Sequence, residues 1–205
     1  MITIWNTHLV GAVVFLMAWG YGVTTFAGEA TTVVTELQAS IMTIMKDGRN
    51  LGYTGRYHTV SPTVEKTHDL ATIARLVVGR HWKGFDASQK STFVETFRNL
   101  SISMYAGRFK DYGGERFDIL SETALKRGNR KLVTSHFVKS DGENITFNYI
   151  LHQVHDEWKI ISVSVNGVSD LALKRAEYGG ILRKDGFPTL IERLKSQIEK
   201  NAHGL

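Results

Sequence analysis

The 205-residue sequence contains no cysteine, and this absence excludes several kinds of chemistry at once. Without a thiol the chain can form no disulfide, no thiolate metal site, no cysteine nucleophile and no lipoprotein cleavage site. Proline is scarce too, with only two residues, while 42% of the chain is hydrophobic. This length and composition predict one packed domain rather than two, held together by its core alone.

Charge is missing from the start of the chain, because the first 28 residues contain no Lys, Arg, Asp or Glu. Residues 9–19 form an apolar run, and smaller residues follow around 25–27. This pattern predicts a secretory signal peptide over residues 1–27, cleaved after Ala27, and an exported domain over 28–205. The basic residues usual at the start of a signal peptide are absent, so an uncleaved inner-membrane anchor is the alternative.

Because the leader has no formal charge, the net charge of +5 and the pI near 9.4 belong to the exported domain. A basic exported domain suits anionic membrane surfaces or acidic partner proteins. An excess of solvated Lys and Arg with no specific target is the alternative. The sequence has no basic cluster interleaved with aromatic residues, so we expect no nucleic-acid partner.

Apolar residues recur at helical spacing in the first half of the domain and again at its end. The predicted helices cover 30–46, a short stretch from Pro62, 69–80, a long stretch from residue 87, 170–184 and 188–200. Gly48 is expected to end the first helix, and Ser61 to cap the second. Asp86 with Gln89 three residues later resembles a capping box, which predicts the start of the longest helix.

The apolar period changes to two after Gly113-Gly114. Strands are predicted over 117–124, 131–138, 145–152 and 158–165, with hairpin connections at 127–129, 141–142 and 156–157. The last strand does not alternate simply, because Trp158 and Ile160 have one parity while Ile161 and Val163 have the other. Either both faces of this strand are covered or a bulge shifts its phase. The order of elements predicts an α+β fold in which a curved antiparallel sheet of four or more strands packs against helices.

Two separated blocks of the sequence resemble one known family. After strand 158–165 the chain continues through NGVS, at 166–169, and Asp170 into LALKRAEYGGILRKDGFPTLIERLK. The block 74–112 carries a second set of matching positions, namely Gly79, Trp82, Gln89, Phe93, Phe97, Leu100 and Tyr105. Both blocks, in this order, resemble the MlaC family of periplasmic phospholipid-binding proteins. Residues 105–117, YAGRFKDYGGERF, also resemble its hopanoid-associated HpnM branch, which leaves the ligand open between phospholipid and hopanoid.

The resemblance implies a periplasmic carrier that holds lipid in an apolar pocket between sheet and helices. Such a carrier would form a single lipid-binding domain over 28–205 and move lipid between an inner-membrane ABC transporter and an outer-membrane lipoprotein complex. A lipid tail loses about 0.8 kcal/mol of favourable burial for each methylene exposed to water, so a diacyl lipid needs a carrier to cross an aqueous gap. We expect a monomer with no catalytic residue, no metal and no cofactor.

Candidates for the pocket lining are apolar and aromatic side chains of the long helix, the sheet and the penultimate helix. They are Phe97, Tyr105, Phe109, Phe147, Tyr149, Ile161, Val163, Leu171, Tyr178 and Leu182. An ordinary filled core would carry the same residue types at the same spacing. Arg108, Arg175 and Arg183 are candidates for the lipid phosphate, since a guanidinium group can form bidentate hydrogen bonds with it. Solvated surface arginines are the alternative.

A curved sheet crossed by a long helix also suits small enzymes of the nuclear-transport-factor-like type. His68-Asp69, His152 and His155-Asp156 are the groupings that such an enzyme would use. However, Asp69 is well placed to cap a helix, and 155–157 has the composition of a hairpin turn. On a strand, His152 and His155 would point to opposite faces, which argues against a metal pair. A third possibility is an adaptor that contacts a transporter and has a filled core without lipid.

Overall fold

The computed structural model describes residues 29–126 and 128–204. In chain order the elements are α1 (Glu29–Lys46), α2 (Gly48–Thr67), α3 (Leu70–Val78), the 3-10 helix η1 (Gly79–Gly84), α4 (Ala87–Arg108), β1 (Arg116–Ala124), β2 (Arg130–Val138), β3 (Asn144–Val154), β4 (Glu157–Val165), β5 (Val168–Ser169), α5 (Asp170–Lys184) and α6 (Gly186–His203). The predicted signal peptide at 1–27 lies outside the described residues, as does Arg127 of the first hairpin connection. Within the described ranges, none of the helices has the length and apolar character needed to span a membrane.

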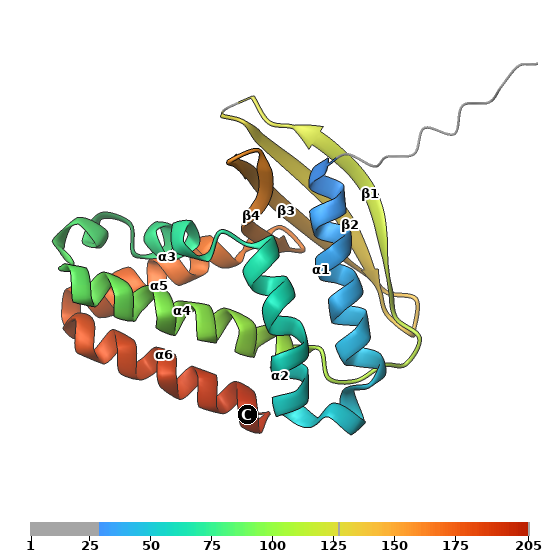
Figure 1. Ribbon diagram of the computed structural model, residues 1–205, viewed down its shortest axis with the longest axis horizontal. Coiled ribbons are helices and arrows are strands. Elements are labelled where there is room, and N and C mark those ends of the chain that lie inside the picture. Colours follow the sequence, from blue (N-terminus) through green and yellow to red (C-terminus); the bar gives the residue numbers. More distant parts are fainter. Residues whose placement is uncertain (1–28, 127, 205) are drawn as a thin grey trace, which may run out of the picture.

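The five strands form one antiparallel sheet in the order in which they occur along the chain. Phe137 lies opposite both Phe117 and Ile145, and Tyr149 lies opposite Val133 and Val163, so apolar side chains share one face. This inner face is covered by helices (Figure 1). The predicted α+β fold with an antiparallel sheet against helices is confirmed.

A β-bulge explains why β4 does not alternate simply. Leu151 pairs with Ile160 and Ile150 pairs with Ser162, so Ile161 is left without a partner in the ladder. The extra residue changes the phase, which places Ile160 and Val163 on the same face although their parities differ. The bulge alternative is therefore the correct one for this strand.

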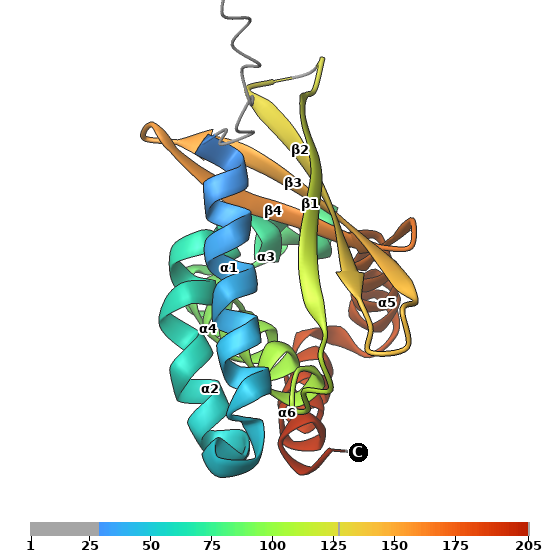
Figure 2. The same cartoon turned by 90° about the vertical axis from the view of Figure 1, so that its right-hand side faces the viewer.

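The helices form two groups around the sheet (Figures 1 and 2). In the first group α1 lies across the inner face with α2 beside it, and Thr31 in the first turn of α1 donates from its backbone N–H and its hydroxyl to the Glu122 carboxylate at 2.8 and 2.7 Å. In the second group α4 packs against α6, and α5 packs against α3 and α6 and also contacts β4. The Arg56 side chain links the groups, because it donates to the backbone oxygens of Ala106 at 2.8 Å and Gly48 at 2.9 Å.

The predicted helix start at Ser61-Pro62 is wrong. Pro62 lies inside α2, which begins at Gly48 and is kinked at Gly52, where φ is 59°. The Ser61 hydroxyl donates to the backbone oxygen of Tyr57 at 2.7 Å and does not cap a helix. Val60 and Val64 beside the proline are fully buried, and this packing outweighs the loss of one helical hydrogen bond.

The caps predicted at two other helix starts are confirmed. The Asp69 carboxylate accepts from the backbone N–H of Thr72 at 2.9 Å at the start of α3. At the start of α4, Asp86 and Gln89 form a reciprocal capping box with distances of 2.8 and 3.1 Å. Both caps satisfy backbone donors that the helix itself cannot pair.

Candidate functional site

Six aromatic rings connect the C-terminal half of α4 with the inner face of the sheet. We call this group the sheet–helix aromatic cluster, and its members are Tyr105, Phe109, Phe117, Phe137, Phe147 and Tyr149. The closest pair, Phe117 and Phe137, has ring centroids 4.9 Å apart. The other five contacts among the six rings have centroid distances of 6.0 to 6.4 Å. These distances are typical of favourable aromatic pairs.

Local geometry brings these rings together from both layers. Tyr105 and Phe109 are four residues apart on α4, so they stack on one side of the helix at its end. Phe147 and Tyr149 are two residues apart on β3, so both point to the inner face. Helix and strand periodicity thus determine which side each ring takes, while the fold places the two sides against each other.

Burial within the cluster is uneven. Tyr149 and Phe137 are buried, with 1% and 9% of their surface exposed. The remaining four members are half-buried and pack against the core from its edge. The cluster therefore extends from the protein interior to the surface, and its outer rings offer apolar area that the fold does not fully cover.

The two tyrosine hydroxyls of the cluster have polar partners. Tyr149 accepts a hydrogen bond from the Gln38 amide at 3.4 Å, and the same amide donates to the Ser135 hydroxyl at 2.9 Å. Burial raises the pKa of Tyr149 to about 12, although the hydrogen bonds to Gln38 and Ser135 oppose the shift. Burial also raises the pKa of Tyr105, with smaller contributions in the same direction from Tyr149 and Asp170. Both hydroxyls are therefore neutral at physiological pH.

His68 is the partner of Tyr105, with its Nε2 atom 3.1 Å from the tyrosine hydroxyl. The imidazole is buried, and this burial lowers its pKa to about 4 even though the Val64 carbonyl favours the charged form. Its Nδ1 lies 3.1 Å from that carbonyl, which can only accept a hydrogen bond. We therefore assign the proton to Nδ1, so that Nε2 accepts from the hydroxyl of Tyr105.

The structure divides the ten predicted lining residues. Tyr105, Phe109, Phe147 and Tyr149 meet in the cluster, and Val163 and Leu171 pack against the same core. The remaining four are buried or half-buried and are not members of the sheet–helix aromatic cluster, namely Phe97, Tyr178, Leu182 and Ile161. Phe97 and Tyr178 both contact Phe93, at centroid distances of 6.1 and 6.4 Å, in a second aromatic group formed by the helices.

Sequence reasoning missed several members of this region. Phe117 and Phe137 have the inward parity of the period-two pattern, so their strands already contained the signal that marks them. Gln38 and Ser135 carry no such signal, since a buried polar residue has no characteristic spacing, and for the same reason nothing in the sequence pairs His68 with Tyr105. Their role becomes visible only through the partners that the fold supplies.

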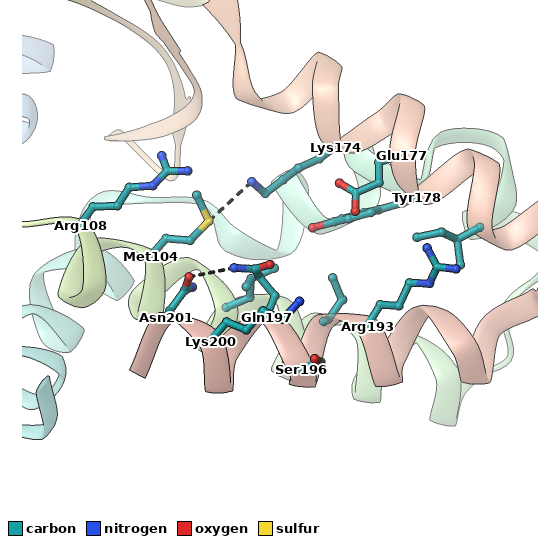
Figure 3. Close-up of a pocket in the computed structure, with 13 residues that line it drawn as sticks. Met104, Arg108, Lys174, Glu177, Tyr178, Arg193, Ser196, Gln197, Lys200 and Asn201 are labelled. Carbon is teal, nitrogen blue, oxygen red and sulfur yellow. Dashed lines mark hydrogen bonds between the residues drawn. The ribbon is translucent and has the colours of Figure 1, made fainter. Parts of the chain in front are cut away.

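The three predicted headgroup arginines do not converge. The guanidinium of Arg175 packs over Gly79, where a β-carbon would come within 3.1 Å of its Nε. Arg183 lies beside Gly179 of its own helix. Arg108 lines a groove that lies between α4, α5 and α6 and has a volume of about 410 Å³ (Figure 3), and neither of the other two arginines lines this groove.

The residues considered for an enzyme have structural partners. His152 Nε2 lies 2.9 Å from Asp69 Oδ2, while the other oxygen of Asp69 caps α3, so the pair ties the start of α3 to β3. Partial burial raises the pKa of Asp69, but the hydrogen bonds from Thr72 and the proximity of His152 outweigh it, and the net pKa lies below its usual range. His155 and Asp156 have φ angles of 47° and 66° and form the predicted hairpin turn.

Metal-binding geometry is absent from residues 29–126 and 128–204. Within these ranges no three His, Asp or Glu side chains are grouped closely enough to hold a metal ion.

A second groove, of about 310 Å³, lies between α1, the end of α2 and the β3–β4 hairpin. Its charged side chains include two ion pairs, Lys66 with Glu36 and Lys159 with Glu157, both at 2.7 Å.

Comparison with known proteins agrees with this fold. Residues 35–196 match the family described as MlaC protein. The chain is 28% identical over 127 residues to the intermembrane phospholipid transport system binding protein MlaC of Haemophilus influenzae, an alignment that covers 60% of this chain and 59% of that protein. The chain thus spans less than two thirds of that relative. The solved structure of a phospholipid-binding protein from Ralstonia solanacearum, in complex with a phospholipid, matches this fold with a TM-score of 0.73. The match covers 85% of this chain and 97% of the Ralstonia chain at 18% sequence identity, and it shows a shared fold.

Proposed function

This chain belongs to the MlaC family, and from that premise we propose that it is a non-catalytic lipid carrier. The acyl chains of a phospholipid would bind at the sheet–helix aromatic cluster. The observation that carries this proposal is the uneven burial of the cluster, whose half-buried rings lie on both the helical and the sheet side. Apolar surface at the edge of a core is where a hydrocarbon chain can enter without crossing a polar layer.

Binding would exchange one set of apolar contacts for another. An acyl chain would enter by separating Tyr105 and Phe109 of α4 from Phe137 and Phe147 of the sheet. The rings would then contact methylene groups in place of one another, and each buried methylene would contribute about 0.8 kcal/mol. Val163 and Leu171 would complete this lining, while Phe97, Tyr178, Leu182 and Ile161 would remain in core packing.

The polar atoms of the cluster support the same proposal. The hydroxyl of Tyr105 is already paired with His68, and that of Tyr149 with Gln38. A hydrocarbon chain that reached these rings would therefore meet no unpaired buried donor or acceptor, which would cost roughly 1–3 kcal/mol per group. Only the apolar faces and edges of the rings would change partners.

The names of two relatives support a proposal for the cellular role. The Haemophilus relative is named for intermembrane phospholipid transport, and the Ralstonia structure contains a phospholipid. We therefore propose phospholipid as the ligand in preference to hopanoid, and a monomeric periplasmic carrier, formed by residues 28–205 and exported by the signal peptide at 1–27. It would receive and deliver lipid at an inner-membrane ABC transporter and an outer-membrane lipoprotein complex.

The direct test is native mass spectrometry of the purified protein, followed by organic extraction of whatever copurifies. We expect a stoichiometric phospholipid bound without a covalent link. A hopanoid would redirect the ligand assignment, and a stable ligand-free protein that loads no lipid from vesicles would contradict the carrier proposal.

Substitution of Phe109 tests where the lipid lies. Phe109→Asp should remove lipid retention, because a carboxylate beside the acyl chain would have to be desolvated. Phe109→Leu should retain lipid, since it keeps an apolar side chain. Leu120→Asp is the matched control, because Leu120 is 47% exposed on β1 and outside the cluster. A folded Phe109→Asp protein that retains lipid would remove this cluster from the binding site.

A further inference from the structure

The groove between α4, α5 and α6 has an uneven charge (Figure 3). We call it the three-helix groove. Its lining includes four basic side chains, Arg108, Lys174, Arg193 and Lys200, and only one acidic side chain, Glu177. Apolar side chains of all three helices form the rest of its floor together with a few neutral polar groups. A concave surface with this excess of positive charge concentrates anions.

The unneutralised charge lies at one end of the groove. Arg193, near the other end, is paired with Asp185 at 3.5 Å. Lys174 is paired with Asp170 at 2.6 Å, and its Nζ also lies 3.6 Å from the sulfur of Met104. Within the described residues neither Arg108 nor Lys200 forms an ion pair. Figure 3 shows Arg108 and Lys174 on either side of Met104, with Lys200 across from them on α6.

Amide groups add hydrogen-bonding capacity at the same end. Asn201 donates to the Ser103 hydroxyl at 2.9 Å, and Gln197 donates to the Asn201 side-chain oxygen at 3.0 Å. Both amides line the groove, and this chain of hydrogen bonds holds them in place between α6 and α4. The basic end therefore offers hydrogen-bonded amide groups beside its cationic side chains.

This end of the groove adjoins the sheet–helix aromatic cluster. Met104 and Arg108 line the groove, whereas Tyr105 and Phe109, which follow each of them on α4, belong to the cluster. Successive helical residues point about 100° apart, so one helix end serves both regions. On α5, likewise, Leu171 packs against the core while Lys174 faces the groove. A single ligand could therefore contact both regions around the end of α4.

We propose that Arg108, Lys174 and Lys200 bind the phosphate of an anionic lipid headgroup whose acyl chains occupy the sheet–helix aromatic cluster. This inference rests on the proposed carrier function and adds a headgroup class to it. Arg108 and Lys200, which form no ion pair within the described residues, would attract a phosphodiester, and Lys174 would donate to it beside its own partner Asp170. The excess positive charge would repel the ammonium group that a zwitterionic headgroup also carries. The carrier should therefore prefer phosphatidylglycerol to phosphatidylcholine.

The test is competitive loading from vesicles that contain equal amounts of phosphatidylglycerol and phosphatidylcholine, with native mass spectrometry as the readout. Wild-type protein should load about three to ten times more phosphatidylglycerol, because a partly exposed charge interaction contributes up to about a factor of five and the two lipids differ by the ammonium group alone. The double variant R108Q/K200Q should lose the preference and load the two lipids in about equal amounts, because its loading of phosphatidylglycerol falls. The matched control K184Q/K195Q loses the same charge from exposed sites on α5 and α6 outside the groove, and it should keep the preference.

The possible results distinguish failure of the headgroup assignment from failure of the carrier proposal. Equal loading by wild type, or an unchanged preference in R108Q/K200Q, would overturn the headgroup assignment and leave the carrier proposal intact. Failure of wild type to load either lipid would overturn the carrier proposal itself. Inorganic phosphate, added as the sodium salt, should form no stable complex with the protein, because it has no acyl chains to hold it. A stable phosphate complex that blocks loading of phosphatidylglycerol would overturn the inference in favour of a free-anion site.

Discussion

Acid should destabilise this protein through His68. The imidazole is buried, donates from Nδ1 to the Val64 carbonyl and accepts from Tyr105, all in its neutral form. Its pKa is about 4 in the folded protein, against an ordinary value of 6.5. Such a difference corresponds to about 3 kcal/mol of unfolding free energy when fully expressed.

The sign follows from proton binding. Below pH 6.5 the unfolded chain takes up a proton at His68, whereas the folded protein does not do so until about pH 4. The contribution of His68 is therefore fully present above pH 6.5 and is lost as the pH falls towards 4, with a maximum slope of about 1.4 kcal/mol per pH unit. Between pH 7 and pH 5 the expected loss is about 2 kcal/mol.

Two carboxylates near these elements act in a lower pH window. The pKa values of Asp69 and Glu122 lie below their ordinary values of 3.8 and 4.5, because hydrogen bonds and nearby positive charge outweigh the opposing effect of burial. Their contribution is present above those ordinary values and is lost only below them. The interval from pH 5 to 7 therefore isolates the effect of His68 from theirs.

The assay is urea unfolding at pH 7, 6 and 5 for wild type and for His68→Gln, whose amide cannot titrate. The variant should lack the loss of about 2 kcal/mol that wild type shows over this interval. Tyr105→Phe is the matched control, since it removes the hydroxyl at Nε2 but keeps the ring that buries the imidazole. It should retain the pH dependence, because burial is the main cause of the pKa shift.

Identical pH dependence in wild type and His68→Gln would refute this reasoning. It would mean that the imidazole takes up a proton as easily in the folded protein as in the unfolded chain. Loss of the pH dependence in Tyr105→Phe would instead show that the hydrogen bond, and not burial, holds the pKa down.

Two further predictions concern helix ends and glycines, and urea unfolding at pH 7 checks both. Gly48→Ala should lower the unfolding free energy by about 1–3 kcal/mol, because a β-carbon there would lie 2.1 Å from the backbone oxygen of Lys110. Gly180→Ala should raise the unfolding free energy by about 0.5–1 kcal/mol, since no atom other than those of its chain neighbours and its own helix backbone lies within 4 Å of its β-carbon position. Equal effects of the two would contradict the packing argument. Asp86→Ala should cost about 1 kcal/mol by removing the cap of α4, and an unchanged midpoint would show that the capping box contributes nothing.

Local patterns in the sequence identified most of the secondary structure. The caps at Asp69 and Asp86 act through hydrogen bonds over three residues, and the hairpin turn depends on the backbone angles of His155 and Asp156. The change of apolar period after Gly113-Gly114 is likewise a local pattern. Such short-range signals can be read from the chain without knowledge of its partners. Pro62 shows their limit, because burial of Val60 and Val64 against other elements overrides the local preference.

The sequence by itself therefore determined the order of helices and strands, the apolar face of the sheet and the resemblance to the MlaC family. Only the tertiary structure decided that the phase of β4 shifts through a bulge at Ile161, and that Tyr105 meets His68. It also decided that Arg108 faces the three-helix groove while Arg175 packs over Gly79. The physical reason is distance along the chain: His68 and Tyr105 are separated by 37 positions, and Gln38 and Tyr149 by 111. Periodicity specifies which face a side chain takes, but packing between distant elements specifies what it meets there.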